Sequence, residues 1–343
     1  MPSFARKSYR HSISEALFGH PPETIDIDRE GYPPSPYTGV PCIYFIHLME
    51  PKRNSGPFPI PRLMGIDLEG IVEIGMSSDI AKKMIKFKNG VLDTDRSDPE
   101  GWKLGYAFSK CKWMREIYGY RKNLLGSTRF SIFRTEKRYL RAHESKAIDL
   151  YCSRFAEPPV LNGQVPGVNG RSAGKGPEVV SRPSAHRNKA FDPAKPKVID
   201  LVDSPRDPLT GLSCVYRVQL MDRNDPSRPF PIPRFIGTDP EGILTIGQTT
   251  DLAHKIRDIR YGIINKKGNG EWALLAHVYD LCDRLNGIYG PREAILKYLK
   301  LTYVETRPSL LRAGEIRATN RYMFRFGELP PMCSQIPGDP RKK

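Results

Sequence analysis

Two stretches of this 343-residue chain are copies of one another. PFPIPRLMGIDLEGIVEIG at 57–75 is answered by PFPIPRFIGTDPEGILTIG at 229–247, and GVPCIYFIHLME at 39–50 by GLSCVYRVQLMD at 211–222. From Cys42 to Gly90, alignment with the second copy needs no gap, and 22 of the 49 positions are identical. An internal repeat of this length predicts that the chain folds as two similar compact domains rather than as a solenoid.

The repeat sets the expected domain boundaries. RFAEPPVLNGQVPG at 154–167 answers RFGELPPMCSQIPG at 325–338, so the first unit spans 39–167 and the second 211–338. Residues 1–38 are an N-terminal extension and residues 339–343 a basic tail. The intervening 168–210 begin with a stretch rich in Gly, Pro, Ser and basic residues, which is typical of a linker.

Each unit predicts the same order of elements. In the first unit, strands are expected at 42–48, 71–75 and 129–135, and helices at 79–88, 102–118 and 139–155. Gly90 is expected to end the first helix. In the second unit the strands fall at 215–220, 243–247 and 299–305, and the helices at 251–260, 272–287 and 309–326. We therefore expect an α+β fold in which helices pack on a small three-stranded sheet in each unit.

Charge and cysteine content restrict the function. A formal charge of +16 and a pI near 9.6 favour a polyanionic partner, nucleic acid above all, although a basic protein without a specific partner has the same composition. No apolar run is long enough to span a bilayer, and residues 1–38 lack a secretory signal, so we expect a cytoplasmic or nucleoid-associated protein without a membrane partner. The six cysteines lack metal-binding or redox spacing and are expected to be buried thiols in a reducing compartment.

The element order, together with CIYFI at 42–46 and EIGMSSDIAKKM at 73–84, resembles the GIY-YIG nuclease superfamily. The second unit offers CVYRV at 214–218 and TIGQTTDLAHKI at 245–256. This resemblance implies one strand tyrosine in each unit, Tyr44 and Tyr216, that helps position and deprotonate an attacking water. It also implies a glutamate on the last helix, Glu144 or Glu315, that binds a divalent metal ion, Mg²⁺ or Mn²⁺.

The catalytic signature that the resemblance implies is incomplete. The second motif tyrosine is replaced by Glu73 in one unit and by Thr245 in the other. The family's helix arginine is replaced by Lys83 and Lys255, and a lysine lacks the planar fork that holds a phosphoryl group. The family's asparagine falls on Asn162 in the first unit but on Cys333 in the second.

Further basic residues are candidates for contacts with nucleic acid. Arg62 and Arg234, repeated within PFPIPR, either contact DNA phosphates or pair locally with Asp67 and Asp239. Lys82 and Lys86 lie on the first predicted helix and are candidates of the same kind.

Three functions fit this sequence. The first is a non-catalytic protein that binds nucleic acid, DNA in the first instance, through two degenerate nuclease-like domains. The second is an active metal-dependent endonuclease that hydrolyses phosphodiester bonds through Tyr44, Lys83, Glu144 and Asn162, with Glu73 as a second acidic group. The third is a protein-interaction scaffold in a nucleoprotein assembly.

Overall fold

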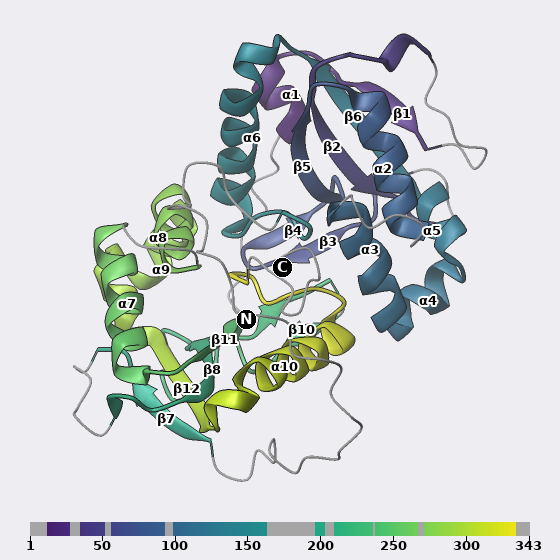
Figure 1. The fold of residues 1–343 in the computed structure, drawn as a ribbon. Helices are drawn as coiled ribbons and strands as arrows, with labels where there is room; N and C mark the ends of the chain where they lie inside the picture. The colour runs from purple at the N-terminus through teal and green to yellow at the C-terminus, as the bar shows by residue number, and fades with distance from the viewer. Residues whose placement is uncertain are drawn as a thin grey trace.

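A computed structural model describes residues 12–27, 35–51, 56–92, 99–162, 196–202, 209–235, 237–266 and 271–333. The fold is α+β, with two four-stranded antiparallel sheets and helices on their faces (Figure 1). The strand orders are β1-β6-β2-β5 and β7-β12-β8-β11, so the two sheets share one topology. Among the described residues, no helix has the length and apolar character needed to cross a membrane.

The first unit contains the following elements: α1 (Ile13–Phe18), β1 (Glu23–Asp26), η1 (Ser35–Tyr37), β2 (Cys42–Leu48), β3 (Ile60–Arg62), β4 (Gly65–Asp67), β5 (Ile71–Ser77), α2 (Ile80–Leu92), α3 (Pro99–Lys110), α4 (Lys112–Tyr118), α5 (Arg121–Gly126), β6 (Thr128–Arg134), η2 (Lys137–Tyr139) and α6 (Leu140–Phe155).

The second unit contains β7 (Lys197–Asp200), β8 (Cys214–Leu220), β9 (Ile232–Pro233), β10 (Thr238–Asp239), β11 (Ile243–Thr249), α7 (Leu252–Asn265), α8 (Glu271–Leu281), α9 (Asp283–Tyr289), η4 (Arg292–Tyr298), β12 (Leu299–Glu305), η5 (Pro308–Leu310) and α10 (Leu311–Phe326).

Two strands complete the sheets from outside the units that the repeat predicts. β1 lies in the expected N-terminal extension and β7 in the expected linker, and each pairs antiparallel with the third strand of its sheet, β6 or β12. The pairing aligns Asp26 with Arg129 and Asp200 with Lys300, which are equivalent positions. The expected three-stranded sheets therefore have four strands, and the repeat extends further upstream than its identical residues indicate.

Two of the expected helices end differently. The predicted helix 102–118 is divided at Cys111, whose sulfur accepts a hydrogen bond from the backbone N–H of Met114 at 3.2 Å and so caps α4. The predicted helix 272–287 is likewise divided at Cys282.

Gly90 does not end its helix, because α2 continues to Leu92. The equivalent Gly262 lies inside α7, where an added Cβ would approach the Cβ of Trp272 to 2.6 Å. This glycine position in the second unit therefore permits close helix packing.

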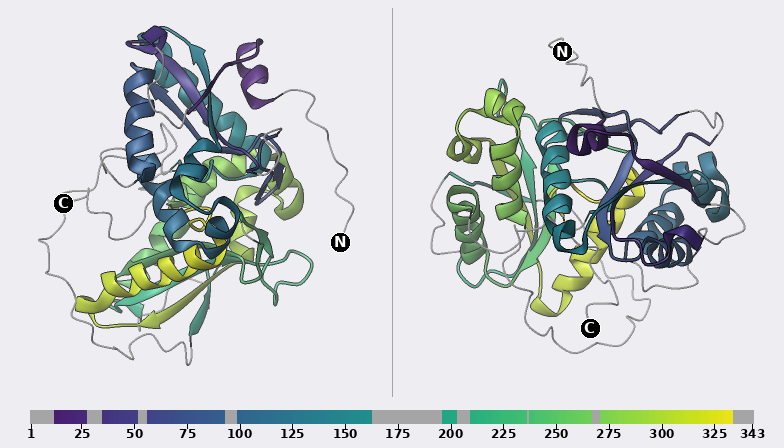
Figure 2. Two further views of the ribbon diagram at one scale, coloured as in Figure 1. Left: turned by 90° about the vertical axis from the view of Figure 1, so that its right-hand side faces the viewer. Right: turned by 90° about the horizontal axis from the view of Figure 1, so that it is seen from above.

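The two units pack against each other around an approximate twofold axis. α6 of the first unit lies beside α8 of the second, and α10 beside α3, in the equivalent pairing (Figures 1 and 2). Phe235 of the second unit packs between Phe58 and Trp113 of the first, with ring centres 5.5 and 5.6 Å away. Tyr106 donates a hydrogen bond to Asn320 at 2.8 Å across the same boundary.

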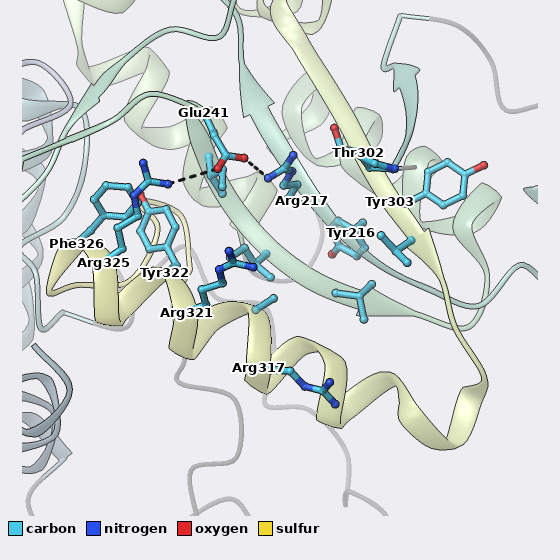
Figure 3. Close-up of a pocket in the computed structure, with 16 residues that line it drawn as sticks. Tyr216, Arg217, Glu241, Thr302, Tyr303, Arg317, Arg321, Tyr322, Arg325 and Phe326 are labelled. Carbon is cyan, nitrogen blue, oxygen red and sulfur yellow. Dashed lines mark hydrogen bonds and ion pairs between the residues drawn. The ribbon is translucent and has the colours of Figure 1, made fainter. Parts of the chain in front are cut away.

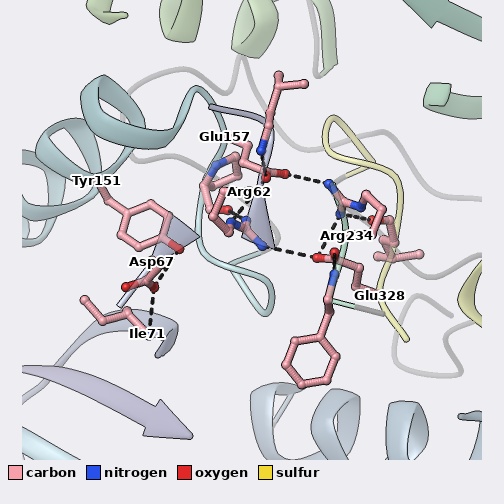
Figure 4. A network of polar contacts seen from close by, with 11 residues as sticks. Arg62, Asp67, Ile71, Tyr151, Glu157, Arg234 and Glu328 are labelled. Atoms are coloured by element: carbon pink, nitrogen blue, oxygen red, sulfur yellow. Dashed lines mark hydrogen bonds and ion pairs between the residues drawn. The ribbon is translucent and has the colours of Figure 1, made fainter. Parts of the chain in front are cut away.

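Four fully buried charged side chains lie on this axis: Arg62, Glu157, Arg234 and Glu328, which we call the ion ring (Figure 4). Arg62 lies 3.2 Å from Glu157 and 3.2 Å from Glu328. Arg234 lies 2.9 Å from Glu157 and 2.8 Å from Glu328. Each arginine therefore contacts one carboxylate of its own unit and one of the other, and the ring carries no net charge.

Candidate nucleic-acid interface

The ion ring changes the expected role of two arginines. Arg62 and Arg234 are each 1% exposed, so neither reaches a nucleic-acid phosphate. The alternative prediction was that these arginines pair locally with Asp67 and Asp239, and the structure does not show such ion pairs either. Asp67 instead accepts hydrogen bonds from the backbone N–H groups of Glu69 and Ile71 and from the Tyr151 hydroxyl. Both interpretations of Arg62 and Arg234 are therefore wrong, because the arginines join the two units.

In the first unit the predicted site residues Tyr44 and Lys83 lie together beside Glu73. The Tyr44 hydroxyl donates to Glu73 Oε1 at 2.7 Å, and Lys83 Nζ lies 3.8 Å from the same oxygen. Lys83 also lies 5.4 Å from the centre of the Tyr44 ring. Glu73 is 2% exposed, so its carboxylate neutralises the lysine in an environment where little solvent screens the charge.

The second unit also places a carboxylate beside its lysine, but this carboxylate comes from a different element. Lys255 lies 5.6 Å from the centre of the Tyr216 ring, but Thr245 replaces Glu73 and supplies no charge. The carboxylate comes from Glu271, the first residue of α8, which interacts electrostatically with Lys255 and hydrogen-bonds to Thr245. Glu271 was not among the residues predicted from sequence. The only sequence signal for it is the absence of a carboxylate at 245.

The predicted metal-binding glutamates lie on equivalent helices. Glu315, on α10, lies close enough to Glu271 and Lys255 for their charges to act on it. Burial and then the charge of Glu271 raise the pKa of Glu315 to about 7, while burial raises the pKa of Glu271. Burial, followed by the charges of Glu271 and Glu315, also raises the pKa of Tyr216 well above its ordinary range. Glu144 is half-buried on α6, which packs against β5 and β2.

Asn162 and Cys333 make equivalent contacts with the strand backbone in the two units. The Asn162 amide accepts from the backbone N–H of Ile74 at 2.8 Å and donates to its carbonyl at 2.6 Å. Cys333 Sγ accepts from the N–H of Ile246 at 3.3 Å and lies 3.6 Å from its carbonyl oxygen. Each side chain therefore holds the backbone of one strand in place, β5 in the first unit and β11 in the second.

The tyrosine of each unit requires the glycine opposite it. Tyr44 pairs with Gly75 in the β2–β5 register, and a Cβ added at Gly75 would lie 2.3 Å from the Tyr44 hydroxyl. In the second unit, a Cβ at Gly247 would lie 2.5 Å from the hydroxyl of Tyr216. Packing alone thus accounts for the tyrosine and glycine that both motifs retain.

The remaining candidates lie at the surface. Lys82 is exposed on α2 and pairs with Asp79 at 3.3 Å, and Lys86 is exposed one turn further on. In the part of the chain that the structure describes, no three His, Cys, Asp or Glu side chains gather to hold a metal ion. A Mg²⁺ ion at Glu144 or Glu315 would take most of its ligands from water and phosphate oxygens.

Five of the six cysteines are buried, as expected, and Cys333 is half-buried.

Comparison with known proteins assigns no family: no protein-family model matches the chain, and no curated protein or solved structure was found to be similar to it.

Proposed function

We propose that this protein binds nucleic acid, DNA in the first instance, through two GIY-YIG-like domains that do not hydrolyse it. The order of the motif elements and the gathering of Tyr216, Lys255 and Glu315 support the kinship with that superfamily. The loss of the second tyrosine and of the helix arginine in both units supports the absence of hydrolysis.

The pairing of Tyr44 and Lys83 with Glu73 is the observation that carries this proposal. The Tyr44 hydroxyl donates its hydrogen bond to the buried Glu73 carboxylate, so this donor is used within the protein and does not position an attacking water. A lysine that stabilises a phosphoryl group needs its charge available, whereas Lys83 is neutralised by the same carboxylate. Glu271 likewise acts on Lys255 in the second unit, so each site holds a carboxylate beside its lysine.

The distribution of charge supports nucleic-acid binding. Because the ion ring sums to zero, the whole formal charge of +16 belongs to the remaining residues. Exposed basic side chains follow α2 and α10, including Lys82, Lys86, Arg312 and Arg321. Such surfaces attract phosphate backbones without reading base sequence.

Binding is tested by the fluorescence anisotropy of labelled duplex DNA, single-stranded DNA and RNA across a salt series. We expect the affinity for duplex DNA to fall at least about tenfold between about 50 and 200 mM salt, because counterions are released from each contacted phosphate. The double variant Lys82→Glu with Lys86→Glu should weaken binding, and Glu116→Gln on α4 is the matched surface control. An affinity for duplex DNA that does not depend on salt would contradict the proposal.

The close approach of Glu271 and Glu315 favours the second candidate function, a metal-dependent endonuclease. The test is incubation of supercoiled and single-stranded DNA with the protein and Mg²⁺ or Mn²⁺, beside Glu144→Gln and Glu315→Gln. We expect the DNA to stay intact in every sample. Cleavage that either substitution abolishes would establish the endonuclease and overturn the non-catalytic assignment.

A further inference from the structure

An open groove lies between α10 and the sheet of the second unit (Figure 3). It has a volume of about 400 Å³. Its floor is a separate small hydrophobic cluster in which four buried side chains pack together: Ile243, Ile246, Tyr322 and Phe326. Val215, Val304 and Ala318 also line it, so an occupant would have to be largely apolar on the side that faces the floor.

In the first unit the equivalent groove is filled by α1. Ile13 is fully buried in the core cluster that contains Ile71, Ile74 and Tyr151, which are the counterparts of the second unit's groove floor. Phe18 of α1 stacks on Phe133 with ring centres 4.1 Å apart. The backbone N–H of Ile13 donates to Glu69 at 2.7 Å. In the first unit, this groove therefore holds a short helix.

The second unit's own counterpart of α1 lacks the residues that fill the groove. β1 and β7 occupy the same register, and Pro22 and Pro196 immediately precede them. Continuing this alignment upstream places Arg187 at the position of Ile13 and Asp192 at that of Phe18. Only Phe191, at the position of Leu17, is apolar, and residues 187–192 lie outside the described part of the chain. Two of the three apolar anchors are thus replaced by charged residues.

The groove also differs in charge from its filled counterpart. Arg217 and Arg321 stand where the first unit has Phe45 and Leu150, and Arg317 and Arg325 are exposed on the same side of α10. Among the described residues that line the groove, Glu241 is the one carboxylate, and it pairs with Arg217 and with Arg325, the latter at 3.6 Å. The rim therefore favours an occupant that carries carboxylates.

We propose that this groove binds a short amphipathic helix of a partner protein. The bound helix places three apolar side chains, spaced as Ile13, Leu17 and Phe18 are in α1, on the floor of the groove. Acidic side chains on its flank face Arg321. Binding of this kind joins an apolar anchor to charge pairs at the rim, which is the usual mode of helix recognition in a groove.

The probe is a fluorescein-labelled helical peptide of about 16 residues, long enough to hold a helix. It carries Ile, Leu and Phe at the spacing of α1 and glutamate at its other exposed positions, and a second peptide carries lysine in place of each glutamate. We expect saturable binding of the glutamate peptide to the full-length protein, with at least tenfold weaker binding of the lysine peptide. Equal affinity for both peptides, or no saturable binding of either, overturns the proposal.

Three variants locate the site. Ala318→Trp fills the groove and Arg321→Glu reverses the charge at its rim, and each should weaken peptide binding at least tenfold. Arg312→Glu, exposed on the same helix and not among the residues that line the groove, should leave it unchanged. Since Arg321 is exposed, its reversal tests the proposal even if Ala318→Trp disturbs the fold.

Two further measurements distinguish other occupants. If Phe191→Ala raises peptide affinity tenfold or more, the chain's own upstream segment occupies the groove, and the proposal is overturned. If Arg321→Glu weakens binding of duplex DNA but leaves peptide binding unchanged, the arginines serve nucleic acid, and the proposal is again overturned. Peptide binding that survives in the Lys82→Glu and Lys86→Glu variant separates this site from the proposed DNA-binding surface.

Discussion

At Glu73 and Glu271 the two units place a carboxylate beside an equivalent tyrosine and lysine, starting from different elements. Glu73 lies on β5, whereas Glu271 is the first residue of α8 and forms a hydrogen bond with Thr245. Burial makes each negative charge costly unless a cation lies beside it. The lysines at 83 and 255 are therefore needed for the stability of the site, whatever they contribute to binding.

Glu315→Gln should raise stability at high pH. The pKa of Glu315 is raised to about 7 from its ordinary 4.5, so the folded state favours the protonated carboxyl. Its contribution is most favourable below pH 4.5 and is lost as the pH rises through 7. We expect the variant to be more stable than the wild type by about 1–3 kcal/mol at pH 8, since one pKa unit corresponds to about 1.4 kcal/mol.

Urea unfolding at pH 5 and pH 8 checks this expectation, with the exposed Glu116→Gln as control. The difference between the wild type and Glu315→Gln should shrink at pH 5. A difference of the same size at both values would show that the Glu315 carboxyl is not shifted.

At the scale of elements, each site depends on how two neighbouring strands pair. The register of β2 with β5 sets Tyr44 opposite Gly75, and that of β8 with β11 sets Tyr216 opposite Gly247. The hydroxyl end of each phenol lies against the glycine and leaves no space for a methyl group. Asn162 and Cys333 then hold the neighbouring residue of the same strand through its backbone.

Gly75→Ala should destabilise the protein by about 1–3 kcal/mol, the usual cost of overpacking a dense core. Its Cβ would lie 2.3 Å from the Tyr44 hydroxyl and 2.5 Å from the ring carbon that bears it, so Tyr44→Phe should not relieve the clash. Tyr44→Ala should relieve it, and a double-mutant cycle in urea measures this coupling.

The matched control is Gly287→Ala in α9, where no atom lies within 4 Å of the added Cβ. It should leave stability unchanged or raise it by up to about 1 kcal/mol. An equal cost of Gly75→Ala with and without Tyr44 would rule out the proposed clash.

Sequence patterns predicted most of the sheet and helix framework because the central strands are short runs of β-forming, mostly apolar residues, and helices such as α2 repeat buried apolar residues at helical spacing. They missed β1 and β7, which are short and are held chiefly by pairing with β6 and β12. They also missed the breaks at Cys111 and Cys282, where a residue with ordinary helix propensity ends one helix and begins the next.

The candidate site was predictable only in part. Motif order was enough to bring Tyr216, Lys255 and Glu315 together, and Tyr44 with Lys83. Glu271 could not be identified, because its position depends on how α8 packs on the sheet. Arg62 and Arg234 were misassigned since their partners, Glu157 and Glu328, lie far away in sequence, and two of the four contacts cross between units.

At the scale of the whole molecule, the ion ring makes the two units one structure. Its four side chains are buried, and each charge has both of its partners only when both units are in place. Removal of one member leaves a buried charge without its full complement of partners, which costs far more than the loss of a surface ion pair.

Arg234→Met should therefore lower the free energy of unfolding by about 3–5 kcal/mol. Arg312→Met, an exposed position on α10, should change it by no more than about 0.5 kcal/mol. Urea titration of both variants at neutral pH makes the comparison. Similar small losses in the two variants would show that the ring does not join the units.

The ion ring also determines how a long ligand can meet the two units at once. Because buried charges and aromatic side chains fix the interface, the separation and angle between equivalent surfaces of the two units are constant. Under the proposed function, a nucleic acid that contacts both units has to fit this fixed geometry, because the units cannot turn to follow it. A duplex whose shape does not match would have to deform, at a cost in affinity.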